Sequence, residues 1–203
     1  MKKQKKQVTT VRHAAAQTNT GEQLTAVGVN SGRNNTKDDL TALGYNAGNG
    51  NTGEDVTVVG AASGKDNSGD NVTAIGEGAA KDNTVNDVIA IGVDAGDGNS
   101  NSNVILIGNS VSATADNQVV IGDASITETL LSGNVLPRTD NVADLGSNTK
   151  QWKDLHVKGN ILLDSKGISV LGASNAISFG KSVDAHQNNE TTYGINAGQG
   201  NTA

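Results

Sequence analysis

The residues that most often perform chemistry in proteins are sparse in this sequence and are not grouped. The chain has 203 residues and no cysteine, so it has no thiolate nucleophile, no thiolate metal site and no disulfide. Its histidines, His13, His156 and His186, lie far apart and lack the spacing of a zinc site. Neither a Gly-x-Ser-x-Gly elbow nor the complete pattern of a phosphate-binding loop occurs. We therefore predict that the chain is not an enzyme and carries no metal or other cofactor.

Carboxylates recur in the polar stretches between apolar segments, and calcium is the ligand that they would suggest. Examples are Asp39, Asp55, Asp70 and Asp87. The nonapeptide pattern of calcium-binding repeats is not matched. We interpret these residues as solvated acids in turns.

A column of threonines suggests a different ligand, because a flat threonine array can order water, as in ice-binding solenoids. The column consists of Thr25, Thr41, Thr57 and Thr73. Isoleucine takes the same place at Ile89 and Ile105, and we expect the column to face the core. Ice binding is therefore the third of the functions that we consider.

The basic residues at the N-terminus form a separate group within a chain of net charge −6. They are Lys2, Lys3, Lys5, Lys6 and Arg12, and residues 1–20 contain no acid. This charge favours an anchor arm that docks on an acidic surface, although a solvated, disordered start is the alternative. No aromatic residue or nucleic-acid-binding module accompanies it, so we expect no nucleic-acid partner. The apolar stretch of a signal peptide and the run of a membrane helix are both missing, so we expect no export by that route and no membrane insertion.

The elements that position all these residues are set by a repeat. Each unit contains a short apolar segment that ends in glycine, and the first six glycines follow one another at intervals of 16 residues. The glycines are Gly28, Gly44, Gly60, Gly76, Gly92, Gly108 and, after 14 residues, Gly122. Aromatic residues make up 2% of the chain, so valine, isoleucine, leucine and alanine must provide the core. One strand and a turn-rich return per unit predict an all-β fold, a β-solenoid or β-roll of 16-residue coils.

A second column keeps the same phase. Asparagine stands seven residues after the glycine in five units, at Asn35, Asn51, Asn67, Asn83 and Asn99. In coils stacked about 4.8 Å apart, equivalent asparagines lie above one another. Their amides can then hydrogen-bond along the stack, so we predict an asparagine ladder.

The predicted strands of the fifth and sixth units are apolar on both faces. Ile89 and Ile91 lie on one face of the first of these strands, and Val88 and Ala90 lie on the other. A strand that is apolar on both faces is normally buried on both. One face can fill its own coil, and the other needs a partner. We expect three copies of the chain around an axis to supply it.

The repeat resembles the head repeats of trimeric autotransporter adhesins and repeats in bacteriophage fibres. The shared motif is an apolar residue, Thr-Ala, an apolar residue and Gly, as in Leu24 to Gly28, and the resemblance covers roughly residues 24–125. In the adhesins the corresponding segments form trimeric left-handed β-rolls. The resemblance thus implies a homotrimer with a structural or adhesive role.

A second resemblance begins after the repeat. Asp144-Leu145-Gly146, a polar turn and Trp152-Lys153-Asp154-Leu155 resemble a module that is found in many phage tail fibres. Trp152 is the large aromatic residue of the module, and we expect Trp152 and Leu155 to anchor it by packing. The repeat pattern then restarts at Thr192-Tyr193-Gly194, so we expect the native fibre to continue beyond this chain.

These observations predict four regions. They are a basic anchor arm (1–20), a solenoid shaft (21–125), a tail-fibre-like β module (126–180) and a restarted repeat (181–203). The leading functional hypothesis is a virion fibre of a tailed bacteriophage, made in the host cytoplasm. Its N-terminus would bind a capsid or tail protein, and its distal part would bind a host cell-surface receptor. The alternative is the head of a trimeric bacterial surface adhesin.

Overall fold

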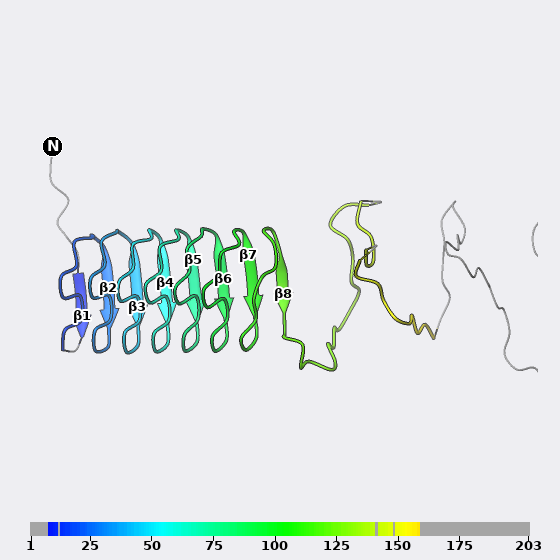
Figure 1. Ribbon diagram of the computed structural model, residues 1–203, viewed down its shortest axis with the longest axis horizontal. Coiled ribbons are helices and arrows are strands. Elements are labelled where there is room, and N and C mark those ends of the chain that lie inside the picture. The colour runs from blue at the N-terminus through cyan, green and yellow to red at the C-terminus, as the bar shows by residue number, and fades with distance from the viewer. Residues whose placement is uncertain (1–7, 12, 141, 148, 159–203) are drawn as a thin grey trace, which may run out of the picture. The chain divides into compact units, whose positions relative to one another are not determined.

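The computed structural model describes residues 8–11, 13–140, 142–147 and 149–158, and within them eight parallel strands form one sheet (Figure 1). The strands are β1 (Val8–Val11), β2 (Leu24–Val27), β3 (Leu40–Leu43), β4 (Val56–Val59), β5 (Val72–Ile75), β6 (Val88–Ile91), β7 (Val104–Ile107) and β8 (Val119–Ile121). Their order in the sheet is their order in the chain. Such an order arises when the chain winds forward as a coil, and Figure 1 shows the successive coils side by side.

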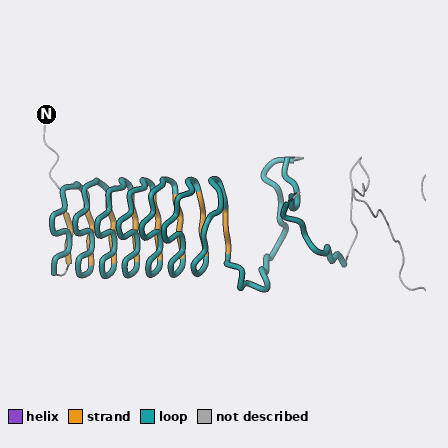
Figure 2. The backbone as a smooth tube through the Cα atoms, viewed as in Figure 1, coloured by secondary structure: helices purple, strands orange, loops and turns teal. Residues whose placement is uncertain are grey.

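The register of the strands equals the length of the sequence repeat. Leu40 pairs with Val56, and Val72 pairs with Val88, so each coil advances the chain by 16 residues. The last step is shorter, because Ile105 pairs with Val119 after 14 residues. Each coil contains one short strand, and loops and turns form the rest (Figure 2). The predicted β-solenoid of 16-residue coils is therefore confirmed, and its strands are parallel.

The solenoid begins earlier than the sequence predicts. β1 lies within residues 1–20, which we assigned to an anchor arm, and Thr9 pairs there with Thr25. The unit was not recognisable as a repeat because Arg12 stands where the later coils have glycine. An arm separate from the solenoid can thus contain only residues that precede Val8.

The interior of each coil is narrow and holds small and medium-sized apolar side chains. The first and third residues of the strands from β2 to β7 point inward and are buried. They are Leu24, Ala26, Leu40, Ala42, Val56, Val58, Val72, Ala74, Val88, Ala90, Val104 and Leu106. On the return side, a Cβ added to Gly48 would lie 3.2 Å from the Leu40 side chain. Because the two sides of a coil are this close, small and medium-sized aliphatic side chains are enough to fill the space between them.

The repeat glycines form a corner at which successive coils touch. From Gly28 to Gly108 their φ angles lie between 133° and 140°, which residues with a side chain rarely adopt. A Cβ on Gly60 would also collide with the carbonyl oxygen of Gly76 in the next coil. Backbone conformation and stacking therefore both require glycine in this column.

The described residues after β8 contain no strand up to residue 158. The chain divides into two compact units, Met1–Val135 and Leu136–Ala203. The predicted β module is not shown by residues 126–158, and its remainder, residues 159–180, lies outside the described residues. The restarted repeat (181–203) also lies outside them.

Candidate assembly surface

The outward face of the sheet carries two columns of side chains. From β1 to β7, the second residue of each strand belongs to one column and the fourth residue to the other. In β8 the first and third residues take these places. The first column contains Thr9, Thr25, Thr41, Thr57, Thr73, Ile89, Ile105 and Val119. The other contains Val11, Val27, Leu43, Val59, Ile75, Ile91, Ile107 and Ile121. Neither column contains a charged residue.

The expectation that the threonine column faces the core is wrong for the single chain. Thr25, Thr41 and Thr57 are exposed, and Thr73 is half-buried. A period of two separates the faces of a strand but does not say which face is inside. The width of the coil decides which face is inside, because Gly32 on the return side lies directly over Leu24 and Ala26 and small residues take its place in the coils up to Gly96.

Large apolar side chains are also exposed on this face. Leu43 is 47% exposed, Ile107 37% and Val119 64%. Tyr45 and Val93, which directly follow the repeat glycines after β3 and β6, are exposed as well. Exposed apolar side chains thus recur from coil to coil on this face, which makes it the candidate for an interaction surface.

Inside the coil, the asparagine column forms the predicted ladder. Each amide nitrogen donates to the amide oxygen of the preceding coil, as from Asn51 to Asn35 and from Asn67 to Asn51, both at 2.9 Å. The same nitrogen donates to a backbone carbonyl two residues on, as Asn67 does to Gly69 at 2.7 Å. Asn35, Asn51, Asn67, Asn83 and Asn99 are buried, and these bonds satisfy their donors.

The ladder has one member that sequence reasoning missed. Asn35 donates to Asn19 at 2.8 Å, so the ladder begins one coil earlier. Asn19-Thr20 repeats Asn35-Thr36, and this dipeptide was the signal that could have revealed the first coil.

The turn carboxylates also bond from coil to coil. Asp38 accepts the backbone N–H of Glu22 at 2.7 Å, and Asp70 accepts that of Glu54 at 2.9 Å. Asp39, Asp55 and Asp87 adopt φ angles of 56° to 60°, which aspartate tolerates in turns. Among the described residues no group of three or more His, Cys, Asp or Glu is placed to hold a metal ion.

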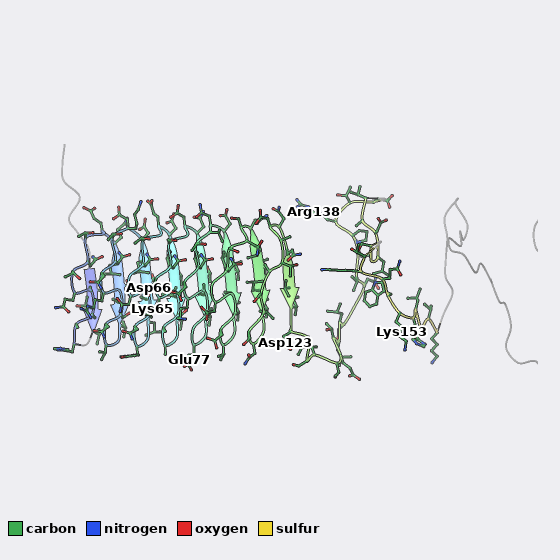
Figure 3. All side chains as sticks on the ribbon, in the orientation of Figure 1. Lys65, Asp66, Glu77, Asp123, Arg138 and Lys153 are labelled. Carbon is green, nitrogen blue, oxygen red and sulfur yellow. The ribbon has the colours of Figure 1, made fainter. Side chains whose placement is uncertain are left out.

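Ion pairs lie on the exterior of the coils. Lys65 pairs with the neighbouring Asp66 (Figure 3), and Lys81 lies 3.2 Å from Asp82 and 3.5 Å from Asp97 of the next coil. The hydrogen bond to Asp82 and the nearby charge of Asp97 raise the pKa of Lys81. Lys81 is on the surface, so we assign this pair a small role in stability.

The remaining predicted site residues belong to the module after the repeat and to the basic N-terminus. Trp152 and Leu155 are each 66% exposed, so the expected packing is not present among the residues that the structure describes. Their anchoring role stays a prediction. Lys2, Lys3, Lys5, Lys6 and Arg12 lie outside the described residues.

The fold defines a class of protein, the parallel β-solenoid repeat proteins. No family model, no curated protein and no solved structure with which the chain was compared matches it. In the part of the chain that the structure describes, no helix has the length and hydropathy needed to cross a membrane.

Proposed function

We propose that this chain is a structural and adhesive fibre protein of a tailed bacteriophage, which acts as a homotrimer. Its N-terminal side binds a capsid or tail protein, and a distal region binds a receptor on the host cell. The observation that carries the proposal is a stack of in-register coils with an uncharged, largely apolar outer sheet face. A stack of this kind supports a structural role, because it can lengthen into a rod by adding coils.

The exposed apolar side chains support self-association. An antiparallel sheet can leave one face in water, but parallel sheets are normally covered on both faces. Here the interior face is covered by the return of the same coil, and the outer face is open. Copies of the same chain would cover it at every coil.

The segment after the solenoid supports the same proposal. Leu130 is 88% exposed, Leu136 77% and Trp152 66%. Side chains of this size contribute about 1.5–3 kcal/mol each when they are buried. An assembly of copies would give them a core that a single chain lacks.

A fibre must also be stiff, and the coils are bonded to one another throughout. Backbone bonds such as Gly60 N to Leu43 O (2.8 Å) and Asp66 N to Asn49 O (2.8 Å) join successive coils on different sides. The asparagine ladder adds bonds inside. A stiff rod with several copies of a distal binding region gains affinity by multivalency.

The assignment to a phage rests on sequence. The Asp144-Leu145-Gly146 and Trp152-Lys153-Asp154-Leu155 motifs resemble those of phage tail fibres, and the basic residues before Val8 suit an acidic docking surface. The bacterial adhesin head is the alternative that shares the repeat.

The proposal is tested by the mass of the purified soluble chain in light scattering, with circular dichroism on the same sample. We expect a β spectrum and a mass near three times 20.5 kDa. A folded β monomer over the whole concentration range would contradict the trimer. Loss of binding of the purified fibre to phage particles after charge reversal of Lys2, Lys3, Lys5 and Lys6 would support the virion anchor.

The exposed threonine column favours ice binding as a second candidate. Thr25, Thr41 and Thr57 form an exposed row with the regular spacing of the coils. This candidate predicts a monomer with thermal hysteresis that is lost in the Thr41→Leu variant. A trimer without thermal hysteresis would exclude it.

A further inference from the structure

We propose that copies of this chain hold together mainly through β6, β7 and β8, and that β2–β5 form a weaker part of the same contact. This inference rests on the self-association proposed above. Its basis is a change of composition along the outer face of the sheet. The column that carries threonine in β2–β5 carries Ile89, Ile105 and Val119 in the last three strands.

The outward side chains of β6–β8 therefore form an apolar patch without hydroxyl groups. The patch consists of Ile89, Ile91, Ile105, Ile107, Val119 and Ile121. All are exposed except Ile105, which is half-buried, and Ile121 is 62% exposed. In β2–β5, each strand presents one threonine beside one aliphatic residue. Burying a hydroxyl without a partner is costly, so an equal contact gains less there.

A second copy of the chain is the partner that this face fits. The columns recur once per coil, about 4.8 Å apart, and another copy has the same spacing along its whole length. The distribution of charge also favours a second copy as the partner. The chain carries a net charge of −6, but the two columns of this face contain no charged residue. The turn carboxylates Asp39, Asp55 and Asp87 come directly before their strands, so they border this face but belong to neither of its columns.

The size of the face explains why a few isoleucines decide its strength. Eight strands about 4.8 Å apart, each about 13 Å long, present roughly 500 Å² in projection. A standard interface takes about 800 Å² from each partner. In so small a contact, a few fully desolvated side chains dominate the binding. The patch on β6–β8 is where such side chains are concentrated.

The test exchanges the residues of one column between the two ends of the full-length chain. The Ile89→Thr/Ile105→Thr variant gives β6 and β7 the pattern of the earlier strands, and Thr41→Ile/Thr57→Ile is the matched converse. Both residue types are β-branched and both occur naturally in this column, so each coil should keep its fold. Trimer dissociation is measured by light scattering or analytical ultracentrifugation over a dilution series, with circular dichroism as the check of folding.

We expect the Ile-to-Thr variant to dissociate at a concentration at least about tenfold higher than the unmodified chain. The Thr-to-Ile variant should dissociate at the same or a lower concentration. Equal weakening by both variants, or no weakening by the Ile-to-Thr change, would overturn the proposal that β6–β8 form the stronger part of the contact. Neither result would contradict the trimer itself. A monomeric unmodified chain would refute the self-association itself, so the two failures are distinguishable.

A second measurement does not depend on these variants. The chain has no cysteine, so Leu43→Cys and Ile107→Cys each introduce a single thiol. The two parent side chains are similarly exposed in the single chain, at 47% and 37%. In the trimer, we expect maleimide to label the Ile107→Cys variant at least about tenfold more slowly than the Leu43→Cys variant, because local opening exposes the weaker strands first. Equal rates, or the reverse order, would overturn the proposal.

Discussion

The solenoid and the segment from residue 123 to 158 both contain many apolar residues, but only the solenoid buries them. In the solenoid, apolar residues recur in register, so Leu40 stacks on Val56 and both are buried. In the segment, Leu130, Leu131 and Trp152 are larger on average but follow no period, and all are exposed. Burial in this chain therefore depends on repetition more than on hydrophobicity. A short coil is unstable alone, and stacking identical coils gives each residue a partner of matching shape.

Hydrogen bonds show the same difference. In the solenoid, backbone bonds link residues of different coils, as from Gly44 N to Val27 O at 2.8 Å. In the segment, the bonds are local, as from Ser147 N to Lys150 O at 2.9 Å. The segment thus has little of its own to hold it in one conformation.

Hydrogen exchange on the full-length chain should show the largest effect. In monomer prepared by dilution, we expect amides of β3–β6 to exchange more than about a thousandfold more slowly than those of residues 124–140. The physical reason is that the former are bonded between coils and the latter are not. In the assembled protein, the segment should gain protection. Similar rates in both regions of the monomer would contradict the comparison.

A glycine substitution should affect the two regions unequally. Gly60→Val places a side chain at φ 135° and against the carbonyl of Gly76, so we expect a loss of about 3 kcal/mol or more in the free energy of unfolding. Gly133→Val is the control for the collision alone, because its φ of 93° also strains a side chain but no atom lies within 4 Å of a Cβ there. Denaturant unfolding followed by circular dichroism measures both. Equal effects would mean that the glycine column is not required.

The asparagine ladder provides a third way to test the solenoid. In Asn67→Asp, the donor to Asn51 and Gly69 is lost and a carboxylate faces two acceptor oxygens, so we expect about 3 kcal/mol of destabilisation at neutral pH. This environment should raise the pKa of the new carboxyl in the folded chain. Stability should then recover as the pH falls through that pKa, since the protonated group can donate. The exposed Asn109→Asp serves as the control in the same pH series.

The smallest effect should come from the surface ion pairs. Removal of the charge in Lys81→Met should not measurably shift the thermal midpoint, because exposed pairs contribute little. The raised pKa of Lys81 means that its contribution is present below the ordinary lysine pKa and is lost at higher pH. A large drop of the thermal midpoint at neutral pH would mean that ion pairs, and not the ladders, provide much of the stability. Thermal unfolding at low and high salt checks this.

Sequence reasoning predicted the solenoid because its signals are periodic. The 16-residue interval between repeat glycines is also the interval between paired residues of neighbouring strands. The asparagines that recur in the sequence are the ones that hydrogen-bond to each other in the ladder. It missed β1 and Asn19 because Arg12 breaks the glycine column in the first coil. It placed the threonine column on the buried face, because the alternation of side chains separates two faces of a strand but does not say which one is buried. The contribution of Trp152 could not be judged, because its packing needs partners that no motif in the chain specifies.

By itself, the sequence determined the coil length, the strands, the turns and the residues that stack, because each is a local preference repeated in phase. Tertiary structure decided which face of the strand is inside. A Cβ on Gly32 would lie 3.1 Å from the Leu24 side chain, so the return of the coil passes close over this face and leaves room there only for small side chains. Closure of the coil thus buries Leu24 and Ala26 and leaves Thr25 and Val27 on the open face, where copies of the chain can meet.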